Sequence, residues 1–260
     1  MRRFITPILA LAIGLFASLP AHATGKLVNM EIIDRNTSSP LDIYRYQRQD
    51  FVAGQPGARY AIQITNCTSA RVLVVLSVDG VNAITGASAD PSQSGYVLNP
   101  HASAEITGWR KSTTETAAFY FTSLADSYAA RTHRPDNVGI IGAAVFQEQE
   151  PIRIEESFAP AASAQDSIAG RANAPAPAAR EGELARAETR AKRLGTGHGE
   201  RLYDPTSYTE FERADNRPNE IVRLRYDSRA RLIAMGVIPQ SRTQLGYTPN
   251  PFPGFTPDPR

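Results

Sequence analysis

Arg71-Val72-Leu73-Val74-Val75-Leu76-Ser77-Val78 is the stretch that decides the fold, and Asp79-Gly80 follows it directly. Apolar side chains occupy both alternating faces of this run, which predicts a central strand covered by a second layer. Asp-Gly is favoured in tight hairpin turns because both central residues take positive φ. We therefore expect residues 81–85 to form the return strand of a hairpin.

Short β-rich segments continue on both sides of this run. Many alternate apolar and polar residues with a period of two, and Pro, Gly, Asn, Ser and charged residues separate them. They cover residues 28–33, 43–52, 60–65, 95–98, 103–109, 116–122 and 138–148. This pattern predicts a mainly-β fold whose first domain, residues 24–158, is an antiparallel β-sandwich of jelly-roll or immunoglobulin-like type.

The composition changes abruptly after residue 158. Residues 159–194 predict an Ala/Pro-rich linker that ends in a short charged helix. Residues 195–238 alternate in places and then suit a short helix that stops at Gly236, which predicts a small α+β module of a β-hairpin and a helix. This module is either marginal alone or packed against the sandwich. Residues 239–260 contain six prolines and predict an extended or disordered proline-rich tail.

The first residues predict export. Two arginines open the chain, an apolar run covers residues 4–19, and Pro20-Ala21-His22-Ala23 ends in the small-x-small pattern that signal peptidase cuts. We expect residues 1–23 to be a signal peptide, and the mature protein to begin near Thr24 and to be periplasmic or secreted. The mature chain has no run of 18 apolar residues, so no transmembrane span is expected.

Charge and motifs narrow the function classes. Removing residues 1–23 takes two arginines from the 28 basic residues and nothing from the 26 acidic ones, so the formal charge becomes zero. Acidic and basic residues alternate along the chain, which argues against nucleic-acid binding.

The histidines are widely spaced and Cys67 is the only cysteine, so we predict neither a metal site, a cofactor nor an intramolecular disulfide. Gly-x-Ser-x-Gly and Ser-x-x-Lys are both absent, and no catalytic residue is assigned.

One polar and aromatic set between the β-rich segments suits sugar or peptide binding. We predict that it rims a cleft above the sheet, and it comprises Tyr128, Arg131, His133 and Arg134. An enzymatic alternative uses Glu148 or Glu150 with His133, because a glycosidase needs two carboxylates a few ångströms apart in different environments. In the structural interpretation, the two glutamates have no catalytic role and are solvated residues at the end of a strand.

Gly195-Thr196-Gly197-His198-Gly199-Glu200 is the most conspicuous short motif. A phosphate-binding loop needs a strand before it and a helix after it, and here a predicted helix precedes the glycines. We therefore expect a flexible connector, with a loop that carries a functional His198 and Glu200 as the alternative.

Several of these runs resemble a group of exported proteobacterial proteins of unknown function. The resemblance lies in residues 59–66, 74–82, 108–112 and 127–132 and in the Gly195–Glu200 motif, and it spans most of the mature chain. It implies a bacterial exported protein and supplies no activity, ligand or catalytic residue.

The leading functional hypothesis is a non-enzymatic periplasmic or cell-envelope protein whose β-sandwich binds a protein partner or stabilises an envelope assembly. The alternatives are a secreted hydrolase of envelope glycans and a carbohydrate-binding module built on the same sandwich. The partner expected is thus an envelope protein or a glycan.

Deletion of residues 239–260 tests the role of the tail. An extended proline segment loses little entropy on binding, so we expect the deletion to remove envelope proteins that co-purify with the full chain. Mass spectrometry of the two purified samples measures this, and an unchanged partner set would refute the role of the tail.

Overall fold

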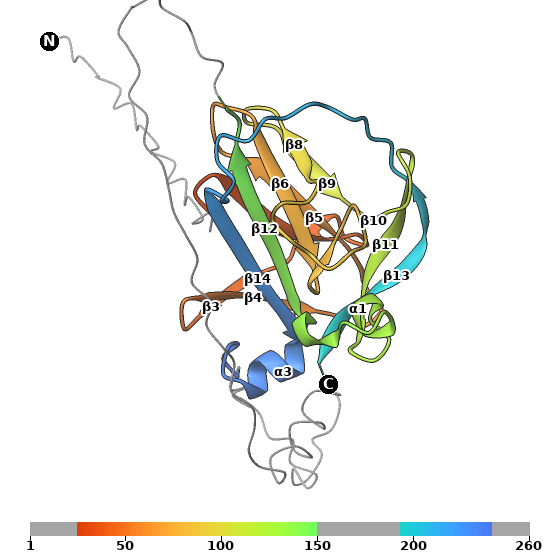
Figure 1. Ribbon diagram of the computed structural model, residues 1–260. Helices are drawn as coiled ribbons and strands as arrows, with labels where there is room; N and C mark the ends of the chain where they lie inside the picture. The colour runs from red at the N-terminus through yellow and green to blue at the C-terminus, as the bar shows by residue number, and fades with distance from the viewer. Residues whose placement is uncertain (1–24, 150–192, 241–260) are drawn as a thin grey trace, which may run out of the picture.

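The computed structural model describes residues 25–149 and 193–240 (Figure 1). The signal peptide expected at residues 1–23, most of the linker and charged helix, and the tail from residue 241 lie outside these ranges. The described chain forms two sheets, which we name sheet A and sheet B. The prediction of a mainly-β fold is confirmed.

Each sheet has seven strands, and short helices lie between some of them. Sheet A contains β1 (Val28–Asp34), β2 (Ser39–Pro40), β5 (Arg59–Asn66), β9 (Ser103–Ile106), β10 (Gly108–Arg110), β11 (Glu115–Ser123) and β13 (Leu194–Tyr203). Sheet B contains β3 (Ile43–Tyr46), β4 (Gln49–Gly54), β6 (Val72–Val78), β7 (Val81–Asn82), β8 (Tyr96–Leu98), β12 (Ile140–Gln147) and β14 (Glu220–Ser228). Within the described residues, the helices are α1 (Tyr128–Arg131), the 3₁₀ turn η1 (Pro135–Asn137) and α3 (Arg229–Ala234).

The apolar run at residues 72–78 is the central strand that its sequence predicts. β6 pairs with β12 on one side and with β7 and β8 on the other, and all its residues except Ser77 are buried. Asp79 and Gly80 have φ values of 53° and 76°, so the Asp-Gly hairpin turn is confirmed. The return strand β7 is shorter than expected and ends at Asn82.

One hydrophobic core lies between the two sheets. Met30, Ile62 and Ile64 of sheet A and Val74 and Leu76 of sheet B belong to the same buried cluster. Aromatic rings cross from one sheet to the other, since Phe121 on β11 packs 5.4 Å from Tyr226 on β14 between ring centroids. The two sheets are therefore held by shared apolar burial, which removes both inner faces from water.

The outer face of β6 is covered by the connection between β13 and β14, which Figure 1 shows passing over the top of the molecule. Phe211 in this connection packs on a second cluster that includes Leu73 and Phe146. The Arg213 guanidinium lies 4.1 Å from the centroid of the Phe146 ring and donates hydrogen bonds to carbonyls of residues 91–93. The second covering layer predicted for this strand is thus the opposite sheet on one face and a long connection on the other.

Residues 195–238 do not form the β-hairpin that their sequence predicts. β13 pairs with β11 in sheet A, whereas β14 lies in sheet B between β12 and β4. Residues 208–213 belong to the connection between them. β13 and β14 bury apolar side chains such as Leu194 and Leu224 in the shared core, and a two-strand hairpin alone has no core to offer them. β14 runs parallel to β4, so the sheets predicted as antiparallel contain one parallel pair.

Two short helices lie near the ends of strands, and α3 is the helix expected before Gly236. Ser127 caps α1 by accepting a hydrogen bond from the Ala130 N–H. α3 begins after a similar cap at Ser228, and Leu232 on it packs against Phe51 on the outer face of sheet B. Figure 1 shows α3 directly after β14 at the lower end of that sheet.

A chain of buried hydrogen bonds ties β13 and β14 to the rest of the core. The Tyr226 hydroxyl donates to Asp79 Oδ1 at 2.5 Å, and the Thr196 hydroxyl lies 2.7 Å from the Tyr226 oxygen. The Tyr60 hydroxyl lies 2.6 Å from Thr196 Oγ1. Because each hydroxyl has one proton and Tyr226 gives its own to Asp79, the bonds run in one direction from Tyr60 to Asp79.

Asp79 is the acceptor at the end of this chain. Its carboxylate also accepts hydrogen bonds from the Thr196 N–H at 2.7 Å and the Gly139 N–H at 2.9 Å. Burial raises the pKa of Asp79 to about 6, and its hydrogen bonds, above all that from Tyr226, only partly oppose this effect. Burial also raises the pKa of Tyr60 and Tyr226, so both remain protonated donors.

Replacing Asp79 by Asn removes a pH dependence of stability. The folded pKa is about 6 and the ordinary value is 3.8, so the contribution of Asp79 is fully present below pH 3.8 and declines as the pH rises through 6. The unfolding free energy of the wild type minus that of Asp79→Asn should therefore fall by roughly 2 kcal/mol between pH 4 and 7. Urea unfolding across this range measures the difference. Asp136→Asn, at an exposed position, is the control, and a difference that stays constant or increases with pH contradicts the prediction.

Candidate functional site

The Gly195–Glu200 motif is part of β13, and the prediction of a flexible connector is wrong. The Tyr120 ring lies across this strand, and a Cβ on Gly197 would be 2.1 Å from the Tyr120 Cζ atom. A Cβ on Gly199 would be 3.4 Å from Cδ1 of the same ring. Gly197 therefore lets an aromatic ring on β11 pack directly on the backbone of its neighbour, whereas the atoms nearest to an added Cβ are Ser127 Cβ at Gly195 and the Ala118 carbonyl oxygen at Gly199.

A register shift between Ala117 and Phe119 accompanies the pairing of β11 with β13. Beside this irregularity, His198 contacts the Tyr128 ring, whereas Glu200 and Leu202 line a cavity. β13 thus supplies side chains to two different places, because a bulge changes the direction in which neighbouring residues point.

A larger hollow lies on the same sheet as the cavity beside Glu200, and Arg35 lines both. The larger one has a volume of about 430 Å³ and is lined by Glu31, Ile33, Arg35, Ser38, Pro40, Gln63 and Glu105. The smaller one, of about 90 Å³, is lined by Arg35, Asn36, Arg59, Tyr60, Thr107, Ala118, Phe119, Glu200 and Leu202. We call the two together the sheet A groove.

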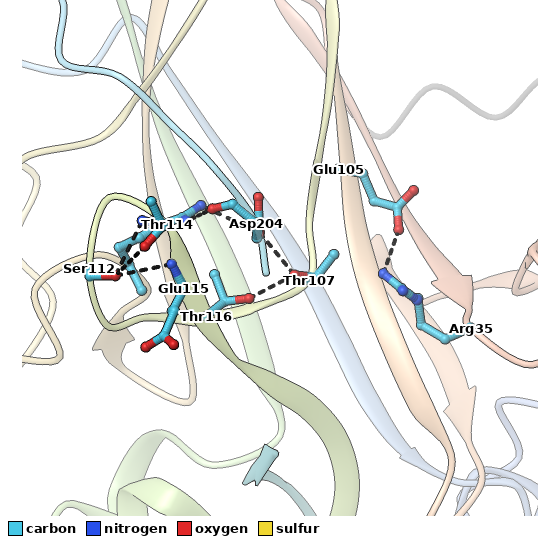
Figure 2. Close-up of polar contacts among 9 residues, drawn as sticks. Arg35, Glu105, Thr107, Ser112, Thr114, Glu115, Thr116 and Asp204 are labelled. Carbon is cyan, nitrogen blue, oxygen red and sulfur yellow. Dashed lines mark hydrogen bonds and ion pairs between the residues drawn. The ribbon is translucent and has the colours of Figure 1, made fainter. Parts of the chain in front are cut away.

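Two charged pairs cross the sheet A groove. Arg35 Nη1 lies 3.0 Å from Glu105 Oε1, a contact that Figure 2 shows, and Arg59 Nη2 lies 3.0 Å from Glu200 Oε1. All four side chains are more than a third exposed. Exposed ion pairs of this kind contribute little to stability, so a ligand can exchange its own polar groups for theirs at small cost.

Polar side chains stand side by side across three strands of the groove. Glu31 on β1 is directly opposite Gln63 on β5, which in turn is opposite Glu105 on β9. Directly opposite residues in antiparallel strands have Cβ atoms about 5 Å apart. The row therefore presents carboxylate acceptors on either side of an amide group that both donates and accepts.

The far end of the groove is fixed by hydrogen bonds around Thr107 (Figure 2). Thr107 joins β9, which pairs with β5, to β10, which pairs with β11. Its hydroxyl donates to Asp204 Oδ2 at 2.9 Å and lies 3.0 Å from Thr116 Oγ1. Arg110 lies 3.4 Å from the same Asp204 carboxylate. This end of the groove is held in place because Thr107 and Asp204 each take part in more than one hydrogen bond or ion pair.

The predicted ligand residues lie elsewhere, around α1. The Tyr128 ring is 4.9 Å from Trp109 and 5.5 Å from His198 between centroids. Arg134 donates to the Gly86 carbonyl at 3.0 Å and thereby holds a loop. Arg131 and His133 are exposed, and none of the four predicted residues lines the sheet A groove. A ligand role for Tyr128, Arg131, His133 and Arg134 stays a prediction.

The structure does not bring Glu148 and His133 together. Glu148 follows the last residue of β12 and forms a 2.6 Å ion pair with Arg71. His133 comes before the start of the same strand. β12 has eight residues, so its two ends are about 25 Å apart, and Glu148 and His133 lie beyond opposite ends. Glu150 lies outside the described residues. In residues 25–149 and 193–240 we also find no cluster of three or more His, Cys, Asp and Glu side chains that could hold a metal ion.

Sequence analysis missed the sheet A groove because its residues come from strands far apart in the chain. The one local signal was the alternation of glycines at positions 195, 197 and 199, which indicates a close approach to a strand backbone. It did not identify Tyr120 as the group that approaches.

Comparisons with known proteins supply no relative. No protein-family model matches the chain, and no significant match was found among the curated proteins or the solved structures. In the part of the chain that the structure describes, every helix is too short or too polar to cross a membrane.

Replacing Gly197 by Ala should destabilise the protein by about 1–3 kcal/mol, because the new methyl group displaces the Tyr120 ring. Gly142→Ala is the matched control in β12, where the nearest atom to an added Cβ is 4.0 Å away. We expect this control to be neutral or slightly stabilising, since Ala loses less conformational entropy than Gly on folding. Chemical unfolding of both variants measures the contrast, and equal effects would show that Tyr120 does not restrict Gly197.

Proposed function

We propose that the protein is an exported, non-enzymatic binding protein of the periplasm or cell envelope, and that the sheet A groove binds a neutral glycan. This proposal takes the two sheets as a β-sandwich that serves as a carbohydrate-binding module. The observation that carries it is the groove itself, a hollow lined by two Arg–Glu pairs and a row of carboxylate and amide groups. Export is supported by the pattern of residues 1–23.

The chemistry of the groove suits hydroxyl groups. Guanidinium groups donate hydrogen bonds, carboxylates accept them, and an amide such as Gln63 does both, so vicinal hydroxyls of a sugar find partners of each kind. Tyr120 is next to Arg59 in strand register and is partly exposed beside the groove. An aromatic ring fixed on a glycine backbone offers apolar surface to a sugar at low entropic cost.

The charge balance argues for a neutral ligand. Three carboxylates and two guanidinium groups line the groove, so a polyanion would meet more repulsion than attraction. In the free protein the two exposed Arg–Glu pairs neutralise each other's charges, and a neutral ligand leaves these charges paired.

A protein partner, which was the leading hypothesis from the sequence, has one supporting observation in the exposed rings of Tyr203 and Tyr208, which are 81% and 92% accessible.

A glycan array followed by calorimetry tests the glycan proposal. We expect the mature protein to bind at least one neutral oligosaccharide, and Arg59→Gln and Tyr120→Leu to weaken that binding about tenfold or more. Leu keeps apolar contact with the glycine strand while removing the aromatic face, so a loss of binding is separable from a loss of folding.

The control is Arg45→Gln, which breaks an ion pair of 3.1 Å with Asp50 on sheet B and should leave glycan affinity unchanged. A wild-type protein that binds no neutral glycan above background would refute the function. Binding that survives both groove substitutions would refute the site.

A further inference from the structure

A second group of polar side chains lies at the edge of sheet A, outside the groove. It consists of Lys111, Arg131, His198 and Arg201, and we call it the basic cluster. We propose that the basic cluster binds an oxyanion, either a phosphate or a carboxylate group. This inference is independent of the glycan proposal, because none of the four residues lines the sheet A groove.

Three separate segments bring the basic cluster together around Tyr128. Lys111 follows β10, and its ammonium nitrogen lies 5.6 Å from the centroid of the Tyr128 ring. His198 on β13 lies 5.5 Å from that ring between centroids. Arg131 is the last residue of α1, the same helix that carries Tyr128, and it is exposed. The tertiary structure thus gathers basic side chains that are far apart in the sequence.

The cations in the basic cluster are poorly neutralised. Arg201 forms an ion pair of 3.1 Å with Glu115, and both side chains are about half exposed. Within the described residues, Lys111, Arg131 and His198 form no ion pair. Gathering like charges costs free energy, and an oxyanion placed among them would relieve that repulsion.

The titration of the cluster agrees with this geometry. Burial lowers the pKa of His198, and the positive charges of Lys111, Arg201 and Arg131 lower it further. Burial and the nearby Arg201 lower the pKa of Lys111. Among residues 25–149 and 193–240, Glu115 is the one carboxylate that forms an ion pair with a member of the cluster. A bound oxyanion should therefore raise the pKa of His198 toward or above its ordinary value.

The frame that carries the cluster is rigid, which reduces the entropy lost on binding. Trp109 is buried, donates its indole N–H to the Gly197 carbonyl at 3.2 Å, and packs against Tyr128. It is also the only tryptophan in the chain, so its fluorescence reports on this place alone.

The experiment titrates the purified mature protein with sodium phosphate, and in a second arm with sodium acetate, at constant ionic strength. Trp109 fluorescence measures affinity, and proton NMR measures the pKa of His198 with and without the anion. We expect saturable binding in at least one arm, a raised His198 pKa in that arm, and affinity that increases as the pH falls through that pKa. The arm that saturates identifies the oxyanion class.

Lys111→Gln and Arg201→Gln should each weaken binding about tenfold, whereas Arg45→Gln on sheet B and Arg59→Gln in the groove should leave it unchanged. Loss of phosphate or acetate binding in Arg59→Gln would overturn the assignment to the basic cluster. A fluorescence change that is not saturable in either arm, or that persists in both cluster variants, would overturn the proposal and leave the glycan proposal untouched.

Discussion

The buried hydrogen bonds that run from Tyr60 through Thr196 and Tyr226 to Asp79 are the constraint on which the fold depends. They join one strand from the first half of the chain, both C-terminal strands and the turn after β6, and so connect the two sheets through the middle of the core. Buried polar groups are costly unless every one has a partner. The side chains of this hydrogen-bond network all have partners only when β13 and β14 occupy their observed positions. The network therefore specifies where the two C-terminal strands pack.

β13 connects this hydrogen-bond network to the two candidate sites. Thr196 enters the core, Gly197 beside it accepts the Tyr120 ring, and the residues after it divide between the sheet A groove and the basic cluster. A single strand therefore positions Glu200 in a charge-balanced groove and His198 among cations. A nearly charge-balanced surface and a basic surface a few residues apart are compatible with one protein that binds ligands of two kinds.

Local patterns predicted local structure well. The double-faced apolar run became β6, the Asp-Gly pair became its turn, and residues 229–235 largely became α3, because burial periodicity, positive φ and capping are properties of neighbouring residues. The motif at residues 195–200 was misinterpreted, since a glycine-rich segment suggests a connector unless the ring that fills the space of the missing side chains is known. Asp79 was predicted only as a turn residue, and its burial became visible only with Thr196 and Tyr226 beside it.

The amino-acid sequence by itself determined that this chain is mainly β, with a buried central strand at residues 72–78, because alternation and apolar content act within a few residues. The tertiary structure alone decided that β14 enters sheet B parallel to β4, that β13 extends sheet A, and that charged side chains from distant strands meet in a groove. Pairing partners depend on which edges and apolar faces remain uncovered once the other strands have packed. That is a property of the whole core, and no local segment encodes it.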